Sequence, residues 1–138
     1  IRSLNGEVLG IHSGIHNFTI GQRKKLGLNS LKALYVVSID FQNNDVIVGD
    51  KDDLYSKVLF ANNLNWTVDP NQLIEKKIEA KIRYRSPEST ASIRFIDDRL
   101  HVSFDEAQRS ITPGQAIVFY EEDKVLGGGW IDEVCREN

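Results

Sequence analysis

The sequence predicts an all-β protein: a small β domain followed by a Greek-key-like β-barrel. Two observations support this prediction. Apolar and polar residues alternate with a period of two in several short segments bounded by turn residues, whereas helical periodicity is weak throughout the chain. Strands spaced this closely favour a barrel or sandwich over a parallel α/β sheet. The 138 residues, 41% of them hydrophobic, suffice for one ordinary domain or two small ones.

The first part of the chain contains one predicted hairpin. Residues 33–39 are β-branched and aromatic, residues 42–44 form a turn, and residues 46–49 return. Single helical turns are predicted over residues 30–33 and 52–55.

A polar and charged stretch, residues 51–56, then separates this hairpin from the rest of the sequence. Because domain boundaries fall in such segments, we expect one domain over residues 1–56 and a second over residues 57–138.

The second part opens with two predicted strands. Residues 57–64 form the first, closed by Trp66 and the turn at residues 69–71. Residues 78–85 form the second, which alternates strictly until Ser86-Pro87 stops it. The apolar face of this strand comprises Ile78, Ala80, Ile82 and Tyr84, and the charged face comprises Glu79, Lys81, Arg83 and Arg85.

Two further hairpins complete the predicted barrel. Residues 91–96 and 100–104 flank the turn Asp97-Asp98, and residues 116–120 and 125–134 flank an acidic turn. In the first of these hairpins, the residues expected to point inward are Ala91, Ile93, Phe95, Leu100, Val102 and Phe104.

A basic loop is the most informative local feature. Arg23, Lys24 and Lys25 are consecutive and follow Gln22, in a chain whose net charge is −3 at pH 7. This local reversal of sign predicts a phosphate-facing loop, with Gln22 as a neutral neighbour able to contact RNA. The alternative is a solvated basic turn between strands.

Several motifs occur in a fixed order along nearly the whole chain. They are Gly10-Ile-His-Ser-Gly14, Phe18-Thr-Ile-Gly-Gln-Arg-Lys24, Asn65-Trp66, Arg83-Tyr84-Arg85, Phe104-Asp-Glu106, Thr112-Pro-Gly-Gln115 and Leu126-Gly-Gly-Gly-Trp-Ile131. Together they resemble the signature of the tRNA-specific 2-thiouridylases, the ATP-dependent enzymes that put sulfur on the wobble uridine of certain tRNAs. The sequence departs from the family pattern at three places: Lys25 stands where Gly is usual, Phe18 where Tyr is usual, and Ala107 where Pro is common.

The resemblance implies that this chain is the tRNA-binding, C-terminal portion of such an enzyme. It implies a second domain similar to the β-barrels of translation elongation factors. The family's ATP-binding loop and its two catalytic cysteines precede the matched region, and the only cysteine here, Cys135, lies outside every motif. We therefore expect no catalysis and no cofactor in this portion. ATP would bind to the N-terminal catalytic domain, which would take sulfur from a persulfide donor.

The expected partners follow from the same resemblance. They are tRNA, the protein's own catalytic domain and a sulfur-relay protein. The start at Ile1 suggests a cut inside a longer chain. A lone cysteine is typical of a reducing cytosol, and no apolar run is long enough to span a membrane, so we expect a cytoplasmic protein.

The resemblance also assigns site residues. The family's Arg-Tyr pair contacts tRNA and corresponds to Arg83 and Tyr84, and its Gln corresponds to Gln115; Arg23 and Lys24 form a further basic patch. Each has a plainer interpretation. The strand pattern would make Arg83 a solvated charge and Tyr84 a core residue, and Gln115 would only bond a neighbouring backbone.

Other functions receive less support from the residues. His12 and His16 are four residues apart, but Gly10 and Gly14 argue against the helix that would bring them together on a metal. No nucleophile–base pair is visible in the sequence to indicate an independent enzyme. The remaining alternative is a structural or protein-interaction module that packs on the catalytic domain without touching RNA.

Overall fold

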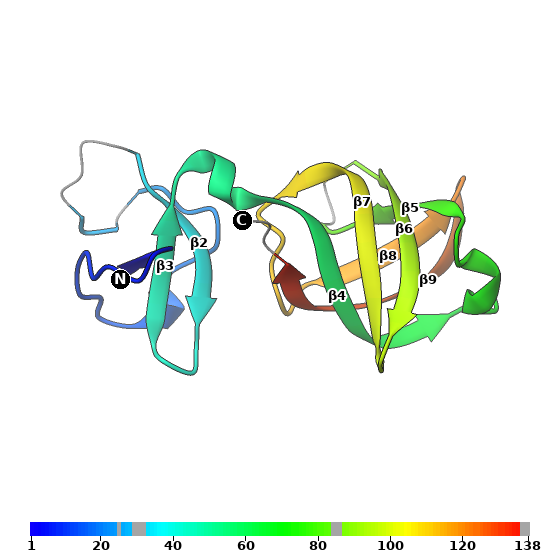
Figure 1. Ribbon diagram of the computed structural model, residues 1–138, viewed down its shortest axis with the longest axis horizontal. Helices are drawn as coiled ribbons and strands as arrows, with labels where there is room; N and C mark the ends of the chain where they lie inside the picture. The colour runs from blue at the N-terminus through cyan, green and yellow to red at the C-terminus, as the bar shows by residue number, and fades with distance from the viewer. Residues whose placement is uncertain (25, 29–32, 84–86, 136–138) are drawn as a thin grey trace. The chain divides into compact units, whose positions relative to one another are not determined.

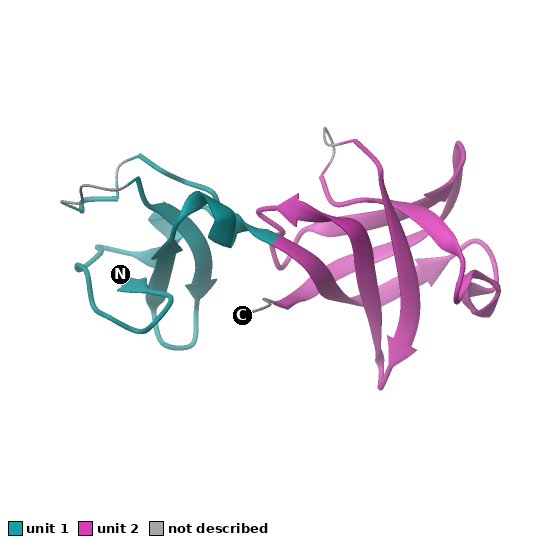
Figure 2. Ribbon diagram, turned by 45° about the horizontal axis from the view of Figure 1, so that its top comes forward, with its two compact units in different colours: residues 1–55 teal, residues 56–138 magenta. Residues whose placement is uncertain are grey.

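The protein is all-β, as the sequence predicts. The computed structural model describes residues 1–24, 26–28, 33–83 and 87–135. It divides into two compact units, residues 1–55 and 56–138 (Figure 2). The described residues form strands and three short 3-10 helices, with no α-helix among them. None of the described helices could cross a membrane.

The first unit contains a three-stranded sheet in the order β1-β3-β2. Strands β2 (Tyr35–Asp40) and β3 (Asp45–Gly49) form the predicted antiparallel hairpin, and β1 (Arg2–Ser3) lies parallel to β3. Strand β1 has only two residues, so no alternation in the sequence could reveal it. The buried side chains of this unit include Ile1, Leu26, Val36, Val46 and Val48.

The β2–β3 turn is held by one carboxylate. Asp40 accepts hydrogen bonds from the backbone N–H groups of Gln42 and Asn43, both at 3.1 Å, and from the Asn43 side-chain amide at 2.7 Å. These bonds, chiefly those from Asn43, lower the pKa of Asp40.

Two short helices accompany this sheet. The helical turn expected near residues 52–55 is the 3-10 helix η2 (Lys51–Leu54), and a second one, η1 (Ile15–Asn17), was not expected. The turn expected over residues 30–33 falls almost entirely outside the described residues.

The second unit is a closed six-stranded barrel in the order β4-β7-β6-β5-β8-β9 (Figure 1). Its strands are β4 (Tyr55–Trp66), β5 (Lys77–Lys81), β6 (Ser89–Ile96), β7 (Arg99–Arg109), β8 (Ala116–Glu121) and β9 (Lys124–Cys135). A 3-10 helix, η3 (Pro70–Leu73), leads from β4 to β5, and the Asp69 side chain caps it by accepting from the Asn71 N–H. The prediction of a small β domain and a barrel is thus confirmed.

Two predictions about the strands of the barrel were wrong. The strand expected over residues 78–85 ends at Lys81, so Arg83 lies beyond the sheet, although Ile82 is buried as expected. Phe95 is not buried as expected: it is 42% exposed, whereas Ala91 and Ile93 on the same face of β6 are buried. Phe95 is the second-last residue of β6, next to the β6–β7 turn, and its large ring is only partly covered there.

Three glycines allow β9 to lie close to both of its neighbours. A Cβ built on Gly127 would lie 2.5 Å from the Asn65 carbonyl oxygen, and one on Gly128 would lie 2.7 Å from the Ile117 carbonyl oxygen. One on Gly129 would lie 2.7 Å from the Asn62 carbonyl oxygen. Because these contacts involve backbone atoms, a side chain at these positions would force the strands apart.

A cluster of side chains joins three strands where β4 closes the barrel. The Arg99 guanidinium of β7 lies 4.1 Å from the Phe60 ring centroid of β4. The same guanidinium pairs with Asp132 at 3.1 Å and Glu133 at 3.0 Å on β9. His101 packs its ring edge against Phe60 with centroids 5.4 Å apart.

Two positions on the same face of β6 should respond differently to a charge. We expect Ile93→Asp to unfold the barrel, because an uncompensated buried charge costs about 3–5 kcal/mol. Phe95→Asp should cost roughly 1 kcal/mol, the average for a point substitution, because the Phe95 ring is only partly covered. Thermal unfolding followed by circular dichroism would measure both, and equal losses would contradict the burial described here.

The close strand approach at β9 predicts a second stability effect. Gly128→Ala should destabilise the barrel by about 1–3 kcal/mol, the usual cost of overpacking, because the added methyl group meets the Ile117 carbonyl. Ala116→Val adds methyl groups at an exposed position on β8 and should stay within about 0.5 kcal/mol of the parent. Urea unfolding would compare the two, and a fully stable Gly128→Ala variant would contradict the close approach.

Candidate nucleic-acid interface

The basic loop of the first unit is fastened to the edge of β2. The Gly21 N–H donates to the Val36 carbonyl at 2.7 Å, and the Val36 N–H donates to the Gln22 carbonyl at 2.9 Å. Upstream, Phe18 and Ile20 pack on the core of this unit. These contacts anchor the start of the basic loop to β2 and to the core of the first unit.

Gln22 braces this loop from within. Its side-chain oxygen accepts from the Thr19 N–H at 3.0 Å, and its amide nitrogen donates to the Lys24 carbonyl at 2.8 Å. The Gln22 amide thus fixes the backbone around Arg23 and Lys24. Both of these side chains are exposed, and neither forms an ion pair with the described residues. Lys25 lies outside the described residues.

Arg83 follows β5 and donates hydrogen bonds to the loop over residues 109–115, which leads from β7 to β8. Its Nη2 donates to the Arg109 carbonyl and, at 2.6 Å, to the Ser110 carbonyl. Partial burial, and then the nearby charge of Arg109, lower the pKa of Arg83. Because the ordinary pKa of arginine is very high, the Arg83 guanidinium remains charged near neutrality. Tyr84 lies outside the described residues.

Gln115 ends the turn over residues 112–115, which is the last part of the same loop. The Thr112 hydroxyl donates to the Ser110 carbonyl at 2.8 Å, which is the carbonyl that Arg83 also contacts. The Gln115 N–H donates to the Thr112 carbonyl at 3.2 Å, and the Ile131 N–H donates to the Gln115 carbonyl at 2.8 Å. The Gln115 side chain is exposed and makes no hydrogen bond to the described part of the chain.

The barrel therefore links two of the predicted site residues: Arg83 contacts the start of the loop over residues 109–115, and Gln115 ends it. Arg23 and Lys24 belong to the other unit. Sequence reasoning missed Arg109, whose charge lies near Arg83. The only signal for it was its place just before the Thr112-Pro113-Gly114 turn.

The structure also shows the surroundings of His12 and Cys135, two residues that the sequence analysis considered for metal binding or catalysis. The His12 Nε2 lies 2.7 Å from the Asn44 carbonyl, to which it donates, and the His12 ring packs edge-on against Phe18. Burial, and then the charge of Glu133, raise the pKa of the Cys135 thiol. A raised pKa disfavours the thiolate, which is the reactive form of cysteine.

The contact between Arg83 and the 109–115 loop can be tested by amide exchange. In Arg83→Ala the amides of Gly114 and Gln115 should exchange about 10-fold faster, because the loop loses a charge-assisted hydrogen bond. Amides of the buried residues Ile117 and Phe119 should keep their protection. Arg94→Ala, which removes an exposed cation from β6, serves as the matched control. Unchanged exchange at Gly114 and Gln115 would contradict the clamp.

Comparison with protein families gives matches over most of the chain. Residues 56–131 match the aminomethyltransferase beta-barrel domain. Residues 1–50 match the tRNA methyl transferase PRC-barrel domain.

Individual relatives match over nearly all of this chain. It is 45% identical over 135 residues to the tRNA-specific 2-thiouridylase MnmA of Halothermothrix orenii, which covers 96% of this chain and 37% of that protein. It is 47% identical over 137 residues to MnmA of Symbiobacterium thermophilum, covering 99% of this chain and 35% of the relative. It is 48% identical over 136 residues to MnmA 1 of Caldanaerobacter subterraneus subsp. tengcongensis, covering 98% and 37%. The chain thus spans little more than a third of the length of these relatives.

Proposed function

The chain belongs to the tRNA-specific 2-thiouridylase family, whose C-terminal part it matches, and from this premise we propose that it is the tRNA-binding portion of such an enzyme. The observation that carries the proposal is the braced basic loop. Arg23 and Lys24 are exposed side by side, on a backbone that the Gln22 side chain fixes, in a chain of net charge −3.

Repulsion between neighbouring cations explains why the basic loop would bind RNA. Two adjacent exposed cations repel each other, and a polyanion relieves that repulsion while releasing its own counterions. Phosphate contacts of this kind position a nucleic acid without reading its sequence. A fixed loop backbone also lowers the ordering cost of binding, because the cations are presented before the RNA arrives.

The barrel supplies the remaining contacts in this proposal. Arg83 adds positive charge beside the loop that it clamps, Gln115 offers an exposed amide for a neutral hydrogen bond, and Tyr84 stacks on a base or donates its hydroxyl. The 109–115 loop thereby links the placement of Gln115 to that of Arg83. The contact surface follows the RNA backbone and its shape more than base identity.

The whole protein, in the same proposal, makes 2-thiouridine at the wobble position of tRNA. ATP and a persulfide sulfur donor act at its catalytic domain, and a sulfur-relay protein delivers the sulfur. The part described here contributes tRNA affinity and placement and performs no chemistry. We place the enzyme in the cytoplasm.

One observation favours a second candidate, a module that packs on another protein domain. The first unit exposes apolar side chains near its start: Val8 is 59% exposed and Ile11 is 95% exposed. An apolar surface of this kind binds protein rather than phosphate. Binding through it would be nearly independent of salt.

Salt dependence decides between the two candidates. Binding of unfractionated tRNA should weaken about 20- to 40-fold between 50 and 200 mM salt if Arg23, Lys24 and Arg83 each neutralise one phosphate. Arg23→Ala or Lys24→Ala should reduce the slope of log affinity against log salt by about 0.7–0.9. Filter binding or fluorescence anisotropy would measure the slopes.

The control for this experiment is Arg94→Ala, which removes one exposed cation from outside the basic loop and should keep the parent slope. If tRNA binding is absent, or if it is indifferent to salt and to both loop substitutions, the RNA-binding proposal fails and the protein-packing module is favoured.

A further inference from the structure

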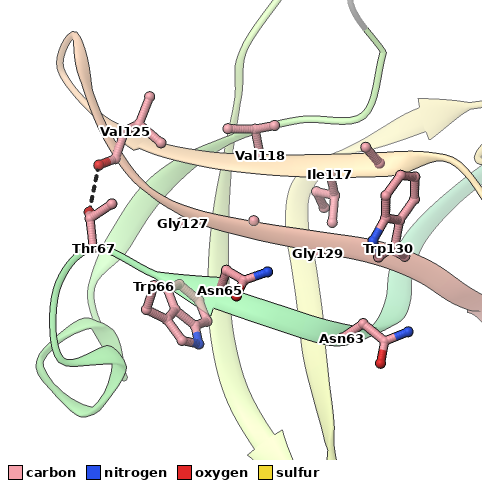
Figure 3. A pocket seen from close by; sticks show the side chains of 12 residues that line it. Asn63, Asn65, Trp66, Thr67, Ile117, Val118, Val125, Gly127, Gly129 and Trp130 are labelled. Atoms are coloured by element: carbon pink, nitrogen blue, oxygen red, sulfur yellow. Dashed lines mark hydrogen bonds between the residues drawn. The ribbon is translucent and has the colours of Figure 1, made fainter.

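A shallow groove lies on the barrel where β9 passes between β4 and β8. It has a volume of about 400 Å³ and is lined from these three strands and the residue that follows β4 (Figure 3). The groove exists because Gly127, Gly128 and Gly129 carry no side chains and their neighbours come too close to admit any. Its floor is therefore largely backbone, which a flat ring can approach closely.

The walls of the groove are aromatic and amide side chains. Trp130 is 50% exposed and has no aromatic partner among the described residues. Trp66, in contrast, is stacked on the core residue Phe119 with centroids 5.5 Å apart and an interplanar angle of 18°. Asn63 and Asn65 are exposed, and their side-chain amides form no hydrogen bond to any other described residue.

Asn63 owes its position to an irregularity in β4. The pairing of β4 with β9 shifts register between Asn62 and Asn65, and Asn63 has a φ of 50°. The left-handed conformation is one that Asn tolerates better than most residues. This bulge lies between the pairs Asn62–Trp130 and Asn65–Gly128, and the Asn63 side chain and the Trp130 indole border the same hollow (Figure 3).

The chemistry of the lining selects the ligand. None of the lining residues, all within the described part of the chain, is charged, so the groove does not select a phosphate. It offers a ring to stack on, a flat floor, and amides that both donate and accept hydrogen bonds. An unpaired nucleobase has the matching features: a π-face and a hydrogen-bonding edge.

The groove also adjoins the proposed RNA surface. Trp130 is the register partner of Ala116, the residue after Gln115, and the Ile131 N–H donates to the Gln115 carbonyl at 2.8 Å. Directly paired residues on antiparallel strands lie about 5 Å apart. An RNA strand whose backbone meets Gln115 therefore has a base within reach of Trp130.

We propose that Trp130 is a stacking platform for one unpaired base of the bound tRNA, with Asn63 and Asn65 contacting the edge of that base. This inference rests on the proposed function and adds a base-binding site to a surface otherwise defined by phosphate contacts. Stacking is tolerant of sequence, so the site favours an unstacked nucleotide over a paired one.

Fluorescence tests the proposal while leaving Trp130 in place. In Trp66→Phe, which keeps an aromatic ring against Phe119, Trp130 is the only tryptophan. Titration with unfractionated tRNA should quench its emission, because a stacked base contacts the indole directly. A saturable binding signal by anisotropy with no change in Trp130 emission would overturn the inference and leave the proposed function intact.

Affinity provides the second measurement. Trp130→Ala should weaken tRNA binding about 5- to 150-fold, and Trp130→Phe should retain most of the affinity. Neither should change the salt slope, because no phosphate contact is lost. Phe95→Ala removes a similarly exposed aromatic residue from β6, 42% exposed against 50% for Trp130, and should bind like the parent.

The outcomes separate the two proposals. Parent-like binding by Trp130→Ala overturns the base-stacking site alone. Equal losses in Trp130→Ala and Phe95→Ala also overturn it, because the effect is then not specific to the groove. If the parent chain binds no tRNA at low salt, the proposed function fails and the stacking site fails with it.

Discussion

The structure of the second unit depends on the closure of the barrel by β4. This strand is bonded to β7 on one side and to β9 on the other, so that the six-stranded sheet has no open edge. Closure needs β9 to approach β4 and β8 closely, which the glycines allow, and the Arg99 cluster links β7, β4 and β9 at the same seam. An open sheet would expose unpaired backbone groups and its apolar face.

Closure also determines where the functional groups stand. The loops that leave a closed barrel must gather at its ends, and this brings Arg83, which follows β5, to the loop that follows β7. That loop continues into the turn that presents Gln115. The glycines needed for closure leave the hollow beside Trp130 as well. Stability and the candidate RNA surface thus have a common cause.

Much of the fold could be predicted from the sequence, because period-two alternation reports directly on which side of a strand is buried. The β6–β7 hairpin illustrates both the strength and the limit of this signal. Its pattern correctly places Ala91, Ile93 and Val102 inside, yet it fails at Phe95, since alternation gives the face of a strand and not how completely a residue near the strand end is covered. Likewise the pattern from Ile78 continues past the point where the strand stops.

The candidate site was less accessible to such reasoning. The residue types of Arg23, Lys24 and Gln115 are visible in the sequence, and the family resemblance marks them. The partners of Arg83 are not, because the carbonyls it contacts lie 26 and 27 residues further along the chain. Every residue has a backbone carbonyl, so the sequence does not indicate which ones Arg83 contacts. The groove beside Trp130 could not be predicted either, because it arises only from the pairing of three strands.

A map of the tRNA contact surface by nuclear magnetic resonance would test the proposed RNA-binding role most directly. An isotope-labelled sample of the chain would be titrated with unfractionated tRNA at low salt, and the backbone amides and the indole N–H groups would be followed. We expect perturbations centred on Arg23, Lys24, Gln115 and the Trp130 indole. Perturbations confined to the exposed apolar segment around Val8 and Ile11, or none at all, would contradict this role.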